Sequence, residues 1–245
     1  MARRVSAAAI VAGSLWCSSA RAIPRDNEVR APKVEEPEPP ETDGPPEART
    51  GGMTTAFRTG VALPFGRVAS GPGNGMPNVH AYQVPLLVET GYRVTPHLSI
   101  GGFLGLAFGD VGGELRRLCS GCSTRSFRIG VLSQVFLRPA ERLDPWVGLG
   151  IGYESVTILN GASSVTLSGP EYVHVLAGLD VRSSRKVGFG PYVDASLGVY
   201  TDSVRLWSVA GPVGIGTAPR SSEENIHGKA LHGWVTAGLR LVLYP

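Results

Sequence analysis

Gly233-Trp-Val-Thr-Ala-Gly-Leu-Arg-Leu-Val-Leu243 is the stretch that decides the fold. Side chains at every second position of a β-strand share one face of the strand. One face of this stretch is apolar, with Val235, Ala237, Leu239, Leu241 and Leu243. The other face is mixed, with Trp234, Thr236, Gly238 and Arg240. The alternation predicts a strand whose two faces meet different surroundings.

The same alternation recurs through the chain from residue 53 onward. It predicts seven further strands, over Thr55–Phe65, Ala81–Val94, Leu98–Phe108, Ser126–Arg138, Trp146–Glu154, Tyr172–Arg182 and Pro191–Tyr200. The composition agrees, because 33 glycines and 19 prolines disfavour long helices and suit short strands joined by turns. We therefore expect an all-β fold with eight strands.

The connections between these strands alternate in length. Those around Pro96, 139–145 and 183–186 are short, whereas those near 66–80, 109–125, 158–170 and 203–231 are longer and rich in turn-forming residues. No apolar run in this region reaches the 18 or so residues of a membrane helix, but strands of 9 to 11 residues span a bilayer when tilted. Sorted connections of this kind predict an eight-stranded antiparallel up-and-down transmembrane β-barrel with short periplasmic turns and longer extracellular loops.

The two faces can be assigned from the cost of charge in lipid. An arginine facing lipid at the middle of a bilayer costs about 2 to 4 kcal/mol. The charged face is therefore expected inside, as a lumen network of Arg58, Glu89, Arg93, Arg128, Glu154, Asp180, Asp194 and Arg240. The apolar face is expected to contact lipid through Val147, Leu149, Ile151, Val173, Val175, Leu179, Val193, Leu197, Val235, Leu239 and Leu241. Eight strands enclose a space that side chains can fill, so we expect a packed polar lumen and no open pore.

The N-terminal residues predict export. Residues 1–22 begin with Arg3 and Arg4, continue through an apolar stretch, and end in an Ala-x-Ala pattern at Ala20 and Ala22, which is typical of a signal peptide cleaved before Ile23. Residues 23–52 are rich in proline and glutamate and lack aromatics, which predicts a disordered periplasmic linker. The barrel is expected over 53–245. There, 16 basic residues oppose 12 acidic ones without a basic run, so no nucleic-acid partner is expected.

Cysteine and histidine offer the remaining chemistry. Cys119 and Cys122, as Cys-Ser-Gly-Cys in an exported chain, are expected to form a local disulfide. A zinc site that adds His227 and His232 is the alternative, and His174 is expected to be a satisfied core histidine rather than a proton-relay group. We expect no catalytic residue, no cofactor and no bound metal.

With these features the region 53–245 resembles small bacterial outer-membrane β-barrel proteins of the OmpA/OmpX type and the OmpW-like group. Its terminal strand, with the near-terminal aromatic Tyr244, resembles the assembly signal of that family. The resemblance implies an outer-membrane location, outer-membrane lipid and the barrel-assembly machinery as partners, and a surface ligand that the sequence does not identify.

The function expected is that of a non-enzymatic barrel with a structural or surface-interaction role. A carrier for small apolar molecules, as proposed for OmpW-like proteins, is the first alternative. A lipid-modifying enzyme is the second, since His97-Leu98-Ser99 resembles the His-x-Ser arrangement of a barrel enzyme of that kind. A secreted, soluble, ligand-binding β-barrel with the faces inverted is the third.

Overall fold

The computed structural model describes residues 51–119, 121–161, 163–209, 218–226 and 228–244. The expected signal peptide and residues 23–50 of the expected linker lie outside this part of the chain. No helix in the described residues is long and apolar enough to cross a membrane.

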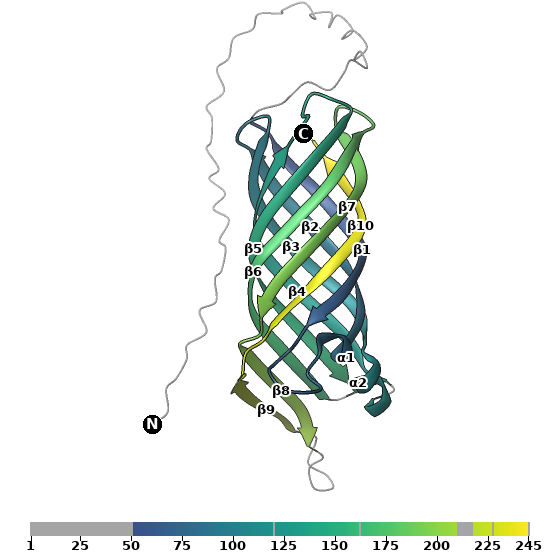
Figure 1. The fold of residues 1–245 in the computed structure, drawn as a ribbon, viewed down its shortest axis with the longest axis vertical. Coiled ribbons are helices and arrows are strands. Elements are labelled where there is room, and N and C mark those ends of the chain that lie inside the picture. The colour runs from purple at the N-terminus through teal and green to yellow at the C-terminus, as the bar shows by residue number, and fades with distance from the viewer. Residues whose placement is uncertain (1–50, 120, 162, 210–217, 227, 245) are drawn as a thin grey trace, which may run out of the picture. The chain divides into compact units, whose positions relative to one another are not determined.

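Eight long strands form the body of the fold (Figure 1). They are β1 (Met53–Gly66), β2 (His80–Arg93), β3 (Leu98–Val111), β4 (Ser123–Phe136), β5 (Leu143–Asn160), β6 (Ser163–Arg182), β7 (Val187–Val199) and β10 (Leu231–Leu243). Each pairs antiparallel with its neighbours in the order β1 to β7 and then β10. The ring closes where β10 pairs with β1, in a register that sets Arg58 opposite Arg240. The eight-stranded antiparallel barrel expected from the sequence is confirmed.

The connections differ at the two ends of the barrel. At the turn end, residues 94–97, 137–142 and 183–186 join neighbouring strands. The loop end carries helix α1 (Met76–Val79), helix α2 (Gly113–Leu118) and a hairpin of β8 (Asp202–Val209) and β9 (Ala218–Asn225). These elements gather at one end of the barrel in Figure 1.

Two connections expected to be loops contain strands instead. The segment 158–170 continues β5 and β6 as a paired hairpin, which turns at Gly161 with φ +53°. Positive φ is a conformation that glycine adopts without steric cost. The segment 203–231 contains β8 and β9, and β8 pairs with the extended part of β6. The expectation was wrong there because the apolar alternation is limited to Val165 and Leu167 in one segment and to Val204 and Leu206 in the other, which is too short to be recognised as a strand.

Alternation places one set of side chains inside the barrel and the other outside. Large apolar side chains inside form a cluster of Leu87, Phe103, Leu132, Phe136, Trp146, Leu176 and Tyr192. A second cluster lies toward the loop end, where Met76 of α1 packs with Val156, Leu167, Tyr200 and Trp234. The interior is therefore filled by apolar layers as well as by the charged residues described next.

Candidate functional site

The eight residues predicted for the lumen network all lie inside the barrel and are buried, each with at most 8% of its surface exposed. They come from β1, β2, β4, β5, β6, β7 and β10, where alternation turns them away from the outer wall. The structure adds three buried charges that were not in the predicted set, Asp144, Glu171 and Arg182. Ion pairs join eight of these charges, through His174, into one chain, and Tyr244 lies between that chain and the remaining group of Arg93, Asp144 and Arg182.

Arg58 occupies the middle of this group. Its Nε lies 2.8 Å from Glu89 Oε1, and its Nη1 donates to Asp194 Oδ2 at 3.0 Å. The guanidinium also lies 5.0 Å from the ring centre of Tyr192. Because the Arg58 side chain is fully buried, these partners replace the water that it loses.

Arg240 connects this centre to the turn end. Its Nη2 lies 3.3 Å from Glu89 Oε2, and its Nη1 donates to Asp180 Oδ2 at 2.6 Å. Asp180 also accepts hydrogen bonds from Trp146 Nε1 at 3.0 Å and from the Tyr244 hydroxyl at 3.2 Å. Three donors therefore converge on one buried carboxylate.

Asp144 lies near the turn end and pairs with two arginines. Arg182 Nη2 donates to Asp144 Oδ2 at 3.1 Å, and Arg93 Nη2 lies 3.9 Å from the same oxygen. The Arg93 guanidinium also lies 4.0 Å from the ring centre of Phe136.

Arg128 forms ion pairs toward the loop end. It lies 3.7 Å from Glu154 and 3.4 Å from Glu171. Glu154 also accepts from Trp234 Nε1 at 2.7 Å and lies 3.2 Å from His232 Nε2. These contacts join β4, β5, β6 and β10 across the lumen.

His174 links the loop-side half to the centre. Its Nδ1 lies 3.0 Å from Glu171 Oε1, and its Nε2 lies 3.7 Å from Asp194 Oδ2. A chain of alternating charges thus runs from His232 through Arg128, His174 and Arg58 to the turn end. Among the buried charges, six carboxylates face five arginines, and a protonated His174 would make the two signs equal.

One cavity inside the barrel is small. A cavity lined by Glu89, Ser99, Gln134 and Arg240 measures about 10 Å³. A buried water needs about 10 to 15 Å³, so this cavity has room for about one. Side chains around Arg240 are therefore closely packed at this level of the barrel.

Two of the three buried charges outside the predicted set, Glu171 and Asp144, lie where strand alternation is hard to follow in the sequence. Glu171 precedes a β-bulge, since the β6–β7 register shifts between Glu171 and Val173, and simple alternation fails across a bulge. Asp144 precedes Pro145 and was assigned to the turn, although it pairs with Asp180 in the β5–β6 ladder. The available signal is its position two residues before Trp146, which places both side chains on the same inward face.

The other candidate residues are placed as follows. Cys119 and Cys122 are joined by a disulfide after α2, so neither thiol is free to bind zinc. His227, also required by the zinc alternative, lies outside the described residues. His97 lies in the turn between β2 and β3, where its Nδ1 is 2.8 Å from the carbonyl oxygen of Phe136. Among the hydrogen bonds of the described residues, none joins His97 to Ser99.

The outer wall is apolar. Of the residues predicted to face lipid, ten are exposed large hydrophobics, and Leu179 is half-buried. On β2 the outward apolar positions run from Tyr82 to Tyr92. Ten steps of about 3.3 Å, tilted by about 40°, give a band about 25 Å tall. This is the height of the apolar band on membrane barrels.

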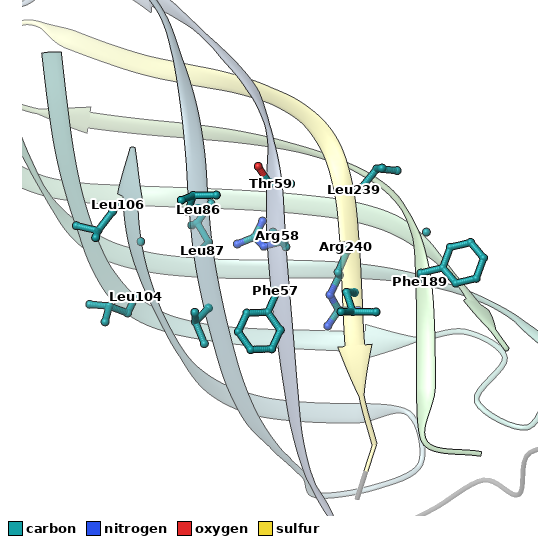
Figure 2. A pocket seen from close by; sticks show the side chains of 14 residues that line it. Phe57, Arg58, Thr59, Leu86, Leu87, Leu104, Leu106, Phe189, Leu239 and Arg240 are labelled. Atoms are coloured by element: carbon teal, nitrogen blue, oxygen red, sulfur yellow. The ribbon is translucent and has the colours of Figure 1, made fainter. Parts of the chain in front are cut away.

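A groove crosses this wall over β3, β2, β1, β10 and β7, and it encloses about 640 Å³ (Figure 2). Thr59 lies between larger outward side chains, because it pairs with Leu86 on one side and Leu239 on the other. Phe57 of β1 and Phe189 of β7 border the groove, while Arg58 of β1 and Arg240 of β10 turn inward (Figure 2). The groove is therefore an apolar feature of the outer surface and is separate from the lumen.

The fold and the two surfaces define a closed eight-stranded β-barrel that is apolar outside and charged inside. Among solved structures, it is similar to Neisserial surface protein A, with a TM-score of 0.43 and 12% identity over 78% of this chain and 96% of that chain. It is also similar to the outer membrane protein OprG of Pseudomonas aeruginosa, with a TM-score of 0.42 and 13% identity over 80% and 98%.

Ail, the attachment invasion locus protein of Yersinia pestis, is similar with a TM-score of 0.35 and 13% identity over 78% of this chain and 99% of Ail. The closed antiparallel barrel that the expected resemblance implies is shown by the strand pairing of this chain itself. No protein-family profile and no curated protein matches the chain.

Proposed function

We propose that this protein is a non-enzymatic integral outer-membrane β-barrel with a structural or surface-interaction role and a lumen closed by charged side chains. The observation that carries the proposal is the outward apolar band. Soluble monomers rarely expose contiguous apolar patches larger than a few hundred Å². Here large apolar residues face outward on all eight barrel strands, a surface suited to lipid.

The orientation follows from the two ends. Short turns are typical of the periplasmic end of such barrels and longer connections of the outer end. In this orientation α1, α2, the β5–β6 extension and the β8–β9 hairpin face the outside of the cell. A surface ligand would meet these elements first, which supports an interaction role.

The proposed route to the membrane is export through a signal peptide cleaved before Ile23. The barrel-assembly machinery would then act on β10, the strand that closes the ring with β1.

The alternatives fit the geometry less well. A carrier that passes apolar molecules through the lumen would have to displace the ion pairs of Arg58, Arg128 and Arg240. A soluble ligand-binding barrel needs the apolar set inside, whereas Leu149 and Leu239 are 60% and 65% exposed. A lipid-modifying enzyme needs a base within hydrogen-bond reach of its nucleophile, whereas His97 Nδ1 lies against the carbonyl oxygen of Phe136 and has no hydrogen bond to Ser99 among the described residues.

The proposal can be tested with the protein refolded in detergent. Folded barrels migrate differently from boiled samples on cold SDS gels, so a band shift together with outer-membrane fractionation is the expected result. Planar bilayers containing the protein should show no stable conductance steps, since the lumen is filled. A protein that stays soluble and shows no shift would contradict the membrane assignment. Steady conductance would contradict the closed lumen while leaving the membrane assignment intact.

A further inference from the structure

Charge is nearly absent from the outward positions of the eight barrel strands. Within the described strands, the two charged residues at these positions are Asp110 on β3 and Arg125 on β4. Both lie at the loop end, and they are diagonal neighbours, because Asp110 pairs with Ser123 and Arg125 pairs with Phe108. The outward charges of the barrel strands are therefore confined to one corner of an otherwise apolar wall, where a charged ligand could bind.

The acidic member of this pair is already neutralised. Arg116 of α2 donates to Asp110 Oδ2, and the backbone N–H of Val111 donates to Asp110 Oδ1 at 2.8 Å. A guanidinium has five N–H donors, so Arg116 retains donors for another anion. Its side chain is 55% exposed.

Arg125 is exposed, and no carboxylate lies directly opposite it on either neighbouring strand. Its cross-strand partners are Phe108 on β3 and Thr157 on β5, and the next outward residue of β4 is Phe127. Among the ion pairs of the described residues, none includes Arg125, and Arg117 of α2 adds a further exposed positive charge. Against Asp110 and Glu114, these two arginines and Arg116 leave the corner with a net charge of +1 at the edge of the apolar band.

An apolar groove begins beside these charges. It encloses about 450 Å³ and is lined by Tyr82, Val84, Leu86 and Phe108, with Gly109, Asp110 and Ser123 at its charged end. Leu86 and the wall around it also line the larger groove of Figure 2. The two grooves together form an apolar track from the charged corner toward the middle of the wall.

We propose that this corner binds a phosphorylated lipid of the outer leaflet, with its phosphate on Arg125 and Arg116 and an acyl chain along the β2–β3 groove. The inference rests on the proposed membrane function, which places the loop end at the outer leaflet. Arginine pairs strongly with phosphate, and long basic side chains extend to headgroup level from the edge of an apolar band. Charge and groove are adjacent, which favours a lipid over a free anion.

Three probes separate the parts of the site. Dioleoyl phosphatidic acid carries phosphate and chains, dioleoylglycerol carries chains alone, and inorganic phosphate carries the anion alone. Retention of each probe by the full chain, refolded in neutral detergent, can be measured by native mass spectrometry. The wild type should retain phosphatidic acid in preference to dioleoylglycerol, and millimolar inorganic phosphate should not displace it.

The variants test the contact at Arg125 and the groove separately. Arg125→Gln should lower the affinity for phosphatidic acid about fivefold, since an arginine near an anionic lipid is worth about 1 kcal/mol. Val84→Trp, which fills the groove without changing charge, should also lower it. Arg205→Gln, which removes an exposed arginine of β8 outside the barrel wall, is the matched control and should leave it unchanged.

The outcomes are separable from those of the proposed function. Every variant must first show the band shift of a folded barrel, and a wild type without that shift contradicts the membrane function itself. If the folded Arg125→Gln protein binds phosphatidic acid as the wild type does, or if inorganic phosphate displaces the lipid, the lipid site is overturned. Equal loss in Arg205→Gln would likewise overturn it, because the effect would then follow net charge alone.

Discussion

Replacing Arg58 with leucine removes the guanidinium at the centre of the lumen and keeps a side chain that fits an apolar interior. The loss leaves Glu89 and Asp194 without the groups that lie 2.8 and 3.0 Å away. Removing one partner of a buried ion pair typically costs about 3 to 5 kcal/mol. Glu89 keeps Arg240 at 3.3 Å, and Asp194 keeps His174 at 3.7 Å, so we expect a loss near the lower limit, about 3 kcal/mol.

The assay is urea unfolding of protein inserted into lipid vesicles, followed by tryptophan fluorescence. With a denaturant slope of about 1 to 3 kcal/mol per molar, this loss lowers the midpoint by about 1 to 3 M. Arg205→Leu makes the same chemical change on exposed β8 and should shift stability by less than about 0.5 kcal/mol. Arg58→Leu combined with Asp194→Asn should recover part of the loss, since one orphaned charge is removed. An Arg58→Leu midpoint equal to that of the wild type would refute the view that this ion pair is a buried, coupled contact.

Two further substitutions probe the wall and the packing of the lumen. Leu104→Arg places a charge on the outward face of β3 and should destabilise the inserted barrel by about 2 to 4 kcal/mol, whereas Leu118→Arg on α2, where the leucine is 86% exposed, should have little effect. Equal unfolding midpoints for the two variants in vesicles would argue against lipid contact at Leu104. Gly178→Ala adds a Cβ only 2.5 Å from Cζ2 of Trp146 and should cost about 1 to 3 kcal/mol with a shifted tryptophan emission, whereas Gly113→Ala meets no atom within 4 Å and should unfold like the wild type.

The faces of the strands could be predicted because alternation depends only on the strand period of two. Arg58 and Asp194 were both placed inside by this reasoning. Their pairing could not be predicted, because the two residues are 136 positions apart and meet only when the ring has closed. The same holds for Arg240 and Asp180, which lie on β10 and β6 with β7 between them. Local sequence thus indicates the direction of a side chain, whereas its partner depends on closure and shear.

Strand ends were harder to predict than strand centres. The continuation of β5 and β6 past residue 158 contains Thr157 and Thr166, whose hydroxyls lie 2.9 Å apart across the strands. The inward face of the β6 part of this extension carries only two large apolar residues, Val165 and Leu167, which are too few to mark a strand. Backbone hydrogen bonds of the β5–β6 ladder keep these residues extended, and such bonds leave no pattern in the amino-acid sequence.

Buried charges also explain why each strand keeps its register. A slip of one residue turns every inward side chain outward. On seven of the eight barrel strands at least one inward residue is charged, so a slip would expose that charge to lipid and leave its partner unpaired inside. The exception is β3, whose inward positions hold Ser99, Phe103 and small residues. Its register is set instead by pairing with β2 and β4 on either side. The lumen network therefore specifies one arrangement of the wall by making the alternatives costly, even where each ion pair only offsets the desolvation of its own charges.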